Sequence, residues 1–494
     1  MKKGKKPNGI AGVLLAGLLA AGVFVLCVFA FFRQYARYGN KLVPELASSL
    51  KFVFIGLLVL LPIVLFFLLR AVSSHLDDTD LITPDYFGVD FSEEEKKKLR
   101  SVERPAYQPL AAVQPILSAP QESEDEAGNE EESGGSRFYM LTEIDTAYEN
   151  YGPPQYDNEM TLREVCEEFR AFSAGQLKLY YDIEDIRRFI GGLAVTKLII
   201  LQGMSGTGKT SLAYAFGEFL DNKTVVVPIQ PMWKERTDLV GYYNEFTRRF
   251  NETTLLYKMY EANCNDEIYI TVLDEMNIAR VEYYFAEFLS LLEIPNPDGR
   301  NLDVVADRWS DDPKLLQSNG KLRLPTNMWF VGTANNDDST FSISDKVYDR
   351  AMVLNLDKKA IPFEAPQGRK RKLSAVRLNE LFERAQREYD ITDRNLRRLK
   401  ELDKYMISTF HITFGNRIMK QIRSYVPVLV ACGGTELEAL DDILSRKVFR
   451  KLESKNPVYV KQMADGTCGY LDELFGEDKL PLCKEQIRLI EQNI

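Results

Sequence analysis

Residues 203–210 read GMSGTGKT, a spacing of glycine, lysine and threonine that can bind the phosphates of a nucleotide. An apolar run typical of a buried strand precedes them at 197–202, and an apolar helical pattern follows. Glycine lets backbone N–H groups surround phosphate oxygens at the beginning of a helix, where the helix dipole favours anions. We expect Lys209 to bridge the β- and γ-phosphates and Thr210 to bind Mg²⁺. The predicted phosphate-binding residues are Gly203, Ser205, Gly206, Thr207, Gly208, Lys209, Thr210 and Ser211.

Two acidic residues end a second strand pattern. Residues 267–275 read EIYITVLDE, so Asp274 and Glu275 stand at the carboxyl end of the predicted strand. In parallel sheets ligands bind at that edge, which would place both acids opposite the phosphate loop. We expect Asp274 to act on Mg²⁺, mostly through water, and Glu275 to polarise the water that attacks the γ-phosphate. The alternative is that the two acids cap the next helix.

A third strand pattern, residues 328–335 (MWFVGTAN), ends in Asn335. Its amide could hydrogen-bond the γ-phosphate or the attacking water if the three strand ends meet at one edge. Taken alone the residue is a weak indicator, because asparagine often ends strands in turns. Together with the phosphate loop and the two acids, Asn335 is the expected third component of a nucleotide-hydrolysing site.

The composition excludes several classes of protein. The 494 residues are 45% apolar and 27% charged, which is ordinary for a globular chain of about two to four domains. A net charge of −10 argues against holding nucleic acid by bulk charge. The six cysteines show no CxxC spacing, and the two histidines, His75 and His411, cannot supply an HExxH zinc site or a Ser-His-Asp triad. His411 lies in an apolar stretch, so we expect it to pack inside the fold.

Two apolar runs predict membrane-spanning helices, at residues 10–32 and 52–69. As helices they would be about 35 and 27 Å long, comparable to a hydrocarbon core of about 30 Å. The basic residues 1–9 suggest a signal peptide, but the first run is too long for one and no clear cleavage site follows. The distribution of lysine and arginine on either side of the two predicted helices barely decides their orientation in the membrane. Because the site needs cytoplasmic nucleotide, we expect a two-pass protein of the cell membrane with the nucleotide site and both termini in the cytoplasm.

Residues 71–137 are expected to form a flexible, acidic linker. Within them, residues 121–132 contain seven acidic residues and no basic one. Such a segment cannot bury enough apolar surface to fold alone. It is predicted to tether the membrane segment (10–70) to the nucleotide-binding domain, and an acidic docking site is the alternative.

The order of these motifs resembles that of an AAA+ ATPase, most closely the McrB-like and dynein-related (MoxR-like) branch. The resemblance covers roughly residues 180–450. It implies a P-loop NTPase core of the α/β class with a parallel sheet at 138–360, and an α-helical lid with a C-terminal extension at 361–494. It also implies ATP or GTP and Mg²⁺ as cofactors, and a ring of subunits with a hexamer as the expected form. The stretches that carry it are GMSGTGKTSL (203–212), DLVGYYN (238–244), LDEMNIARVEYYFAEFLSLLE (273–293), VGTANNDDSTFSISDKVYDRA (331–351) and FGNRIMKQI (414–422).

The resemblance assigns roles to three further residues. Asn335 resembles the residue called sensor 1, and Arg350 resembles the arginine finger that reaches the γ-phosphate of the neighbouring subunit. Arg417, in FGNR, resembles sensor 2 of the lid and would bind nucleotide. The alternatives are that Arg350 pairs with Asp349 or Asp345, and that Arg417 is a surface residue of a helix.

One departure concerns the nucleotide. McrB reads MNTADRS around sensor 1 and is associated with GTP, whereas residues 334–340 here read ANNDDST, with Ser339 where the arginine stands. ATP is therefore the expected nucleotide and GTP the alternative.

Two other regions are less informative. Residues 294–325 match the place of an inserted hairpin in this branch, which would either grip a threaded substrate or be passive. The basic clusters 369–372 and 397–400 are expected to be solvated faces.

These features predict a membrane-anchored AAA+ NTPase that hydrolyses ATP in a ring to remodel or activate a protein partner, which a neighbouring gene would encode. A first alternative is an McrB-like motor that drives a nuclease partner in a defence system. A second is a nucleotide-gated membrane scaffold. The acidic charge favours the remodelling function, in which nucleic acid is reached only indirectly if at all.

Overall fold

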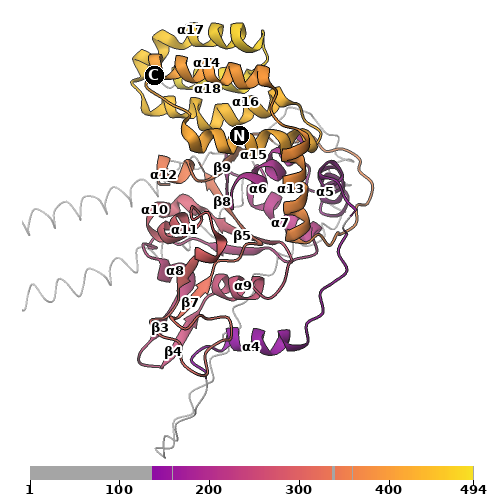
Figure 1. Cartoon of the computed structure of the whole chain (residues 1–494), viewed down its shortest axis with the longest axis vertical. Helices are drawn as coiled ribbons and strands as arrows, with labels where there is room; N and C mark the ends of the chain where they lie inside the picture. Colours follow the sequence, from indigo (N-terminus) through magenta and orange to yellow (C-terminus); the bar gives the residue numbers. More distant parts are fainter. Residues whose placement is uncertain (1–135, 158, 336–339, 359, 493–494) are drawn as a thin grey trace, which may run out of the picture. The chain divides into compact units, whose positions relative to one another are not determined.

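Five parallel strands form the central sheet in the order β2–β5–β8–β1–β9 in the computed structural model (Figure 1). The structure describes residues 136–492, except residues 158, 336–339 and 359. The α/β class predicted for the core, with a parallel sheet, is confirmed. The strands of this sheet are β1 Leu198–Gly203, β2 Val225–Pro228, β5 Tyr269–Asp274, β8 Met328–Asn335 and β9 Met352–Asn355.

The register of the sheet brings the three polar strand ends together. Gly203 at the end of β1 pairs with Asn335 at the end of β8. On the other side of β8, Leu273 of β5 pairs with Gly332, one residue before Asp274 reaches the same edge. The phosphate loop, the two acids and Asn335 therefore meet at one edge, as the three strand patterns predicted.

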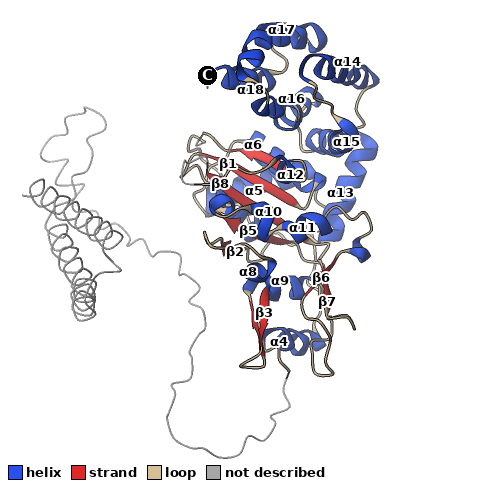
Figure 2. Cartoon of the chain, turned by 90° about the vertical axis from the view of Figure 1, so that its left-hand side faces the viewer, coloured by secondary structure: helices blue, strands red, loops and turns tan. Residues whose placement is uncertain are grey.

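Alternate residues of β1, β5, β8 and β9 belong to two separate cores, which explains why helices cover both faces of the sheet (Figure 2). In β1, Ile199 and Leu201 face one core, and Leu198 and Ile200 face the other. The first core is covered by α5 Leu162–Gln176, α6 Ile183–Val195 and α7 Lys209–Phe219. The second is covered by α4 Met140–Ala147, α8 Arg236–Val240, α9 Thr254–Ala262, α10 Val281–Tyr284 and α11 Ala286–Leu291.

Short elements connect these layers. The helix α12 Asp345–Tyr348 precedes β9, and three 3₁₀ helices lie at η1 Tyr148–Asn150, η2 Met276–Ile278 and η3 Pro297–Gly299. Two antiparallel hairpins stand apart from the central sheet, β3 Gly241–Asn244 with β4 Arg249–Glu252, and β6 Asn301–Asp303 with β7 Lys321–Arg323. The second hairpin lies within the predicted insertion 294–325.

The chain after β9 forms a region of helices, here called the C-terminal helices (residues 375–492). Helix α15 (Gly415–Ala431) of this region packs on α6. At this contact Gly191 lets the ring of Tyr425 approach closely, since a Cβ on the glycine would lie only 2.9 Å from the ring. The Tyr425 hydroxyl donates to Asp442 at 2.6 Å. The elements are α13 Ala375–Glu388, α14 Asp393–Phe410, α15 Gly415–Ala431, α16 Glu436–Lys447, η4 Phe449–Ser454, α17 Pro457–Phe475 and α18 Pro481–Gln492.

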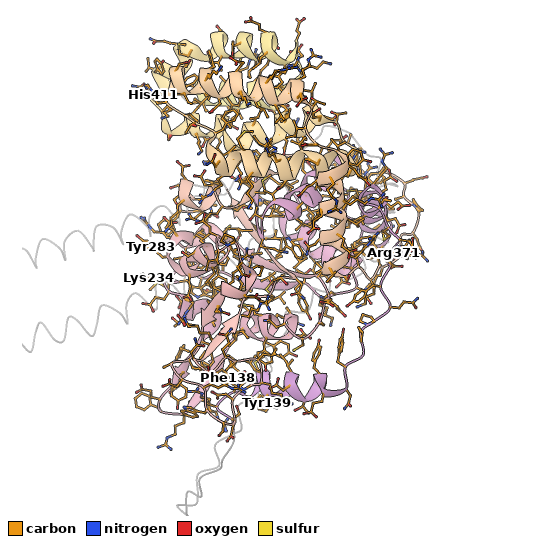
Figure 3. All side chains as sticks on the ribbon, viewed as in Figure 1. Phe138, Tyr139, Lys234, Tyr283, Arg371 and His411 are labelled. Atoms are coloured by element: carbon orange, nitrogen blue, oxygen red, sulfur yellow. The ribbon has the colours of Figure 1, made fainter. Side chains whose placement is uncertain are left out.

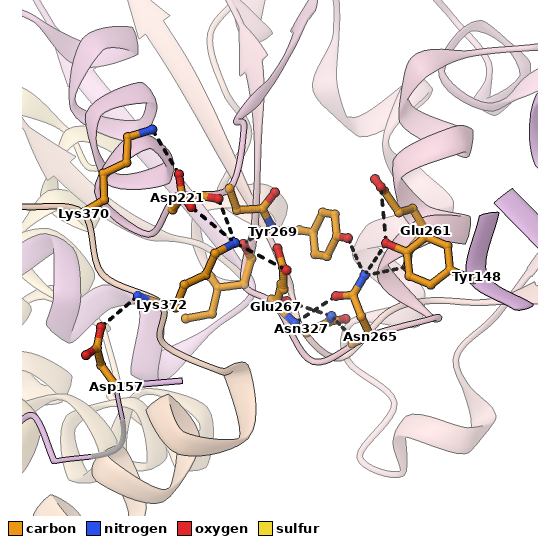
Figure 4. A network of polar contacts seen from close by, with 12 residues as sticks. Tyr148, Asp157, Asp221, Glu261, Asn265, Glu267, Tyr269, Asn327, Lys370 and Lys372 are labelled. Atoms are coloured by element: carbon orange, nitrogen blue, oxygen red, sulfur yellow. Dashed lines mark hydrogen bonds and ion pairs between the residues drawn. The ribbon is translucent and has the colours of Figure 1, made fainter. Parts of the chain in front are cut away.

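The basic cluster 369–372 is only in part the solvated face that was expected, because Arg369 and Lys370 are exposed but Arg371 and Lys372 are half-buried. Arg371 forms two hydrogen bonds to the Glu168 carboxylate at 2.6 and 2.7 Å. Lys370 and Lys372 both contact Asp221 (Figure 4). These ion pairs fasten the segment between β9 and α13 to α5 and to the end of α7. The prediction was wrong for Arg371 and Lys372 because their acidic partners lie far away in the sequence.

His411 also departs from its prediction. It is exposed at the end of α14, in the left-handed conformation with φ 54°, and its backbone N–H closes the helix by bonding the Ile407 carbonyl (Figure 3). The residue after a helix commonly takes this conformation. The neighbours Phe410 and Ile412 are buried, so the apolar stretch packs around a histidine that points outward.

The predicted membrane helices at 10–32 and 52–69, the basic segment 1–9 and nearly all of the linker 71–137 lie outside the described residues. Among the residues that the structure does describe, no helix combines the length and apolarity needed to cross a bilayer. Arg137, the last residue of the predicted linker, is buried and belongs to the folded region.

Met276 packs so closely against Gly332 that a larger residue at position 332 should destabilise the fold. A Cβ at this position would lie 2.0 Å from Sδ of Met276, the residue directly after Glu275. Gly332→Ala should therefore lower the free energy of unfolding by about 1–3 kcal/mol through overpacking, measured by chemical denaturation. Gly466→Ala is the matched control, because a Cβ there meets nothing within 4 Å in helix α17 and should be neutral or stabilising. Equal stability of the two variants would contradict the packing account.

Candidate nucleotide-binding site

The phosphate loop connects β1 to α7 and needs glycine at two positions. Gly206 and Gly208 have φ angles of 77° and 94°, a region that disfavours a side chain. Helix α7 begins at Lys209, which is only 6% exposed. The Lys209 ammonium donates to the carbonyls of Gly203 at 2.9 Å and Met204 at 2.7 Å. The lysine is thus folded over the loop, with its charge next to the backbone that would surround the phosphates.

Tyr181 supports this loop from outside and was missed by sequence reasoning. Its hydroxyl donates to the Gly208 carbonyl at 3.1 Å, and its ring would lie 3.4 Å from a Cβ on that glycine. Tyr181 is 5% exposed, and burial raises the pKa of its hydroxyl. The phenol therefore stays protonated and acts as a permanent donor to the loop.

A single carboxylate oxygen joins three elements of the site. Oδ1 of Asp274 accepts a hydrogen bond from the Thr210 hydroxyl at 2.8 Å and another from the Thr333 hydroxyl at 2.8 Å. These residues come from β5, α7 and β8. Thr333 was not predicted, although it is a polar residue in an otherwise apolar strand, and that was the signal available.

The donor set suits Mg²⁺. Magnesium prefers oxygen ligands and is commonly held by one or two protein groups together with phosphate oxygens and water. Thr210 and Asp274 offer a hydroxyl and a carboxylate at hydrogen-bond distance from each other, beside the phosphate loop. Within residues 136–492 as described, no cluster of three or more His, Cys, Asp or Glu side chains offers an all-protein cage. Phosphate oxygens and water would supply the remaining ligands of a magnesium ion at this position.

Glu275 is held in a strained backbone conformation. Its φ and ψ are 52° and 46°, in the left-handed region that costs an ordinary residue about 1 kcal/mol or more. The conformation persists because the Glu275 N–H donates to the Thr333 hydroxyl at 2.8 Å and Met276 fills the space over Gly332. The turn leaves the Glu275 side chain exposed at the edge of the sheet.

Asn335 ends β8 beside the phosphate loop and is half-buried. Its carbonyl accepts hydrogen bonds from the Asn277 side chain at 2.9 Å and from the Thr340 hydroxyl at 3.1 Å. Asn277 is 5% exposed and also accepts from the backbone N–H of Phe341 at 2.8 Å. It therefore joins the turn after Glu275 to the end of β8, a role that sequence reasoning missed.

Arg350 lies at the opposite edge of the sheet, just before β9 begins. Its guanidinium donates to Glu293 at 2.6 Å and to the Lys346 carbonyl at 2.8 Å. The pairing with Asp349 or Asp345 that was considered as an alternative is not seen. Those acids pair with Lys451 and Arg450, respectively, at 3.2 and 2.7 Å.

Arg417 lies with Arg350 and not with the phosphate loop. It donates to the second oxygen of Glu293, so that one carboxylate holds both arginines. They line a pocket of about 670 Å³ between α15 and the amino end of β1, with Lys197, Arg300 and Lys420 also in its wall. The phosphate loop follows the carboxyl end of the same six-residue strand, about 20 Å away at the usual rise per residue.

The parallel sheet, the phosphate loop after β1 and the acids after β5 define the described residues as a P-loop nucleotide-binding fold. Residues 198–351 match the family "AAA domain (dynein-related subfamily)". The chain therefore contains an AAA+ ATPase domain, and nucleotide binding with Mg²⁺ is the general property of such domains.

Other comparisons add little. The fold is similar to a crystal structure described as "putative ATPase from Cytophaga hutchinsonii", with 13% identity, a TM-score of 0.39, and coverage of 61% of this chain and 87% of that one. No curated protein matches the chain.

Thr333 generates the second prediction. Thr333→Val keeps the shape of this buried side chain but leaves the Glu275 N–H without its acceptor, which costs about 1–3 kcal/mol, and frees the Asp274 carboxylate from one donor. We expect slower nucleotide hydrolysis and lower thermal stability. Thr333→Ser keeps the hydroxyl and should retain most of both. If the valine and serine variants hydrolyse nucleotide equally fast, the hydroxyl does not position Glu275.

Proposed function

We propose that the chain hydrolyses ATP with Mg²⁺ at a site shared between two subunits of a ring. One observation carries the proposal. The phosphate loop, Asp274 and Glu275 lie at one edge of the sheet, whereas Arg350 lies at the other, a strand length away. Arg350 cannot reach the phosphates bound by its own chain. A second copy, joined head to tail, would supply the arginine, and such heterologous contacts form a ring when the rotation between copies closes.

Each residue has a stated task in the proposed reaction. The loop amides and Lys209 would neutralise the phosphate oxygens, and Thr210 with Asp274 would hold the magnesium. Magnesium supplies charge neutralisation on the outer phosphates when it is bound. Glu275 orients and polarises the attacking water, and Asn335 lies within the same edge to contact the γ-phosphate or that water. Arg350 of the neighbouring subunit stabilises the charge that develops as the γ-phosphate leaves.

Arg417 joins Arg350 in this proposal. Because Glu293 binds both guanidiniums, the two arginines form one cationic unit at the edge where the neighbouring nucleotide would dock. The nucleotide contact expected of Arg417 would therefore be made across the subunit interface, to the phosphates of the next chain.

The work of the ring is proposed to be the remodelling or activation of a protein partner at the membrane. The apolar runs 10–32 and 52–69 would anchor each subunit, with both termini and the ATPase domain in the cytoplasm. The net charge of −10 supports a protein partner over nucleic acid. ATP is the proposed nucleotide and GTP its alternative, and the ring is proposed to be a hexamer.

The shared site is tested by steady-state hydrolysis of ATP and of GTP by the full chain in detergent, at increasing protein concentration. Turnover per subunit should rise with concentration, with Glu275→Gln as the inactive blank. Arg350→Ala should lower turnover by roughly 10³-fold or more, as loss of an arginine finger does. Mixing Arg350→Ala with Glu275→Gln should restore hydrolysis. Turnover that is independent of concentration and of Arg350 would refute a shared site.

Anchoring is tested separately by cell fractionation. The full chain should sediment with membranes and be released by detergent, not by high salt or alkaline carbonate. A chain that lacks residues 1–70 should move to the soluble fraction. Sedimentation of the shortened chain with membranes would show that the two apolar runs are not the main anchor.

A further inference from the structure

The backbone around Arg350 is held by side chains at four consecutive carbonyls. Helix α12 is only one turn long, and the end of any helix leaves carbonyls without intrahelical partners. Here each carbonyl from residue 348 to residue 351 accepts a hydrogen bond from a side chain. The donors are Lys447 to Tyr348 at 2.7 Å and also to Ala351, Gln421 to Asp349 at 3.1 Å, and Thr196 to Arg350 at 2.9 Å.

Three of these four bonds come from the C-terminal helices. Lys447 is the last residue of α16, and Gln421 lies in α15, whereas only Thr196 belongs to the core of the AAA+ domain. Helix α15 also carries Arg417, which shares Glu293 with the Arg350 guanidinium. The C-terminal helices thus hold the main chain beside Arg350 and also contact the carboxylate that pairs with its head group.

Lys447 is an unusual donor because its ammonium is almost completely buried. It is 3% exposed, and burial lowers its pKa to about 7. A buried amine is costly unless it is well hydrogen-bonded. The side chain does not line the pocket that holds Arg350 and Arg417. Lys447 is therefore placed to act on Arg350 through the backbone that it binds.

We propose that Lys447 is a positioning residue that fixes Arg350 to the C-terminal helices, so that the placement of these helices sets whether the arginine reaches the neighbouring γ-phosphate. The inference rests on the proposed shared site. The new element is that the position of Arg350 depends on the C-terminal helices as well as on the central sheet. The segment 348–351 moves with α15 and α16, because breaking from them would leave three carbonyls and a buried amine without partners.

The test uses full-length Lys447→Met in detergent. Methionine keeps the length of the side chain but cannot donate to the carbonyls. We expect kcat to fall at least about 10-fold with little change in the KM for ATP, because the variant keeps its own phosphate loop and loses an interaction made across the interface. Lys404→Met is the matched control, since Lys404 is an exposed lysine of α14 that pairs only with Glu401, and it should keep full turnover.

Mixing Lys447→Met subunits with Glu275→Gln subunits distinguishes a misplaced Arg350 from general damage to the fold. A Lys447→Met subunit keeps an intact Glu275, and a Glu275→Gln subunit keeps a well-placed Arg350. In an equal mixture about a quarter of the head-to-tail interfaces should combine the two intact parts and regain hydrolysis. A merely structural role for Lys447 would give no recovery, because the damaged subunit would also lose its own site. Gln421→Met, which removes the bond to Asp349 and also changes a residue of the pocket wall, serves as the second variant if Lys447→Met does not fold.

Two outcomes would overturn the inference: full turnover of both Lys447→Met and Gln421→Met, or a loss of turnover that Glu275→Gln cannot complement. Failure of the shared site itself is recognised independently. In that case the mixture of Arg350→Ala with Glu275→Gln would also fail to recover hydrolysis. Recovery with Arg350→Ala but not with the Lys447 and Gln421 variants refutes the positioning role alone.

Discussion

Two hydrogen bonds to one carboxylate oxygen of Asp274 organise the candidate nucleotide-binding site. Thr210 and Thr333 both donate to it, and Thr333 in turn accepts from the backbone of Glu275. A helix and two strands that are distant in sequence are thereby fixed to one another at the carboxyl edge of the sheet. The phosphate loop, the proposed metal ligands Thr210 and Asp274, and Glu275, which is proposed to act on water, share one set of bonds. A change in any of them is therefore felt by the others.

The opposite edge is organised by a second carboxylate. Glu293 binds two guanidiniums at once, and the surrounding pocket wall adds the basic side chains of Arg300 and Lys420. Without a partner, repulsion between the arginines would push their head groups apart. The carboxylate keeps them together at the place where the proposed neighbour would present a more highly charged phosphate. The two edges of one sheet therefore carry complementary halves of one proposed site.

Sequence reasoning predicted the parts of the site that are contiguous in the chain. The phosphate loop, Asp274 and Asn335 were recognised because each stands directly after an apolar strand pattern, and strand order in a parallel sheet then brings them together. Tyr181, Asn277 and Thr333 were missed because their roles depend on single hydrogen bonds to residues far away in the sequence. The same reason explains the error at 369–372, where the neutralising acids Glu168 and Asp221 cannot be recognised from local pattern. Conversely, the exposed His411 shows that an apolar stretch does not reveal which of its residues closes a helix.

Arg137 gives the domain a defined mechanical connection. Its guanidinium is bonded to both carboxylate oxygens of Asp312 at 3.0 and 2.7 Å and lies 4.0 Å from the ring centre of Trp309, inside the insertion 294–325. Its carbonyl accepts from Phe250 of β4. A pull on the preceding chain would therefore act on the insertion and on the β3–β4 hairpin through Arg137, and on α9 through helix α4, which follows directly. A force applied to the chain before Arg137 would thus also strain the two hairpins.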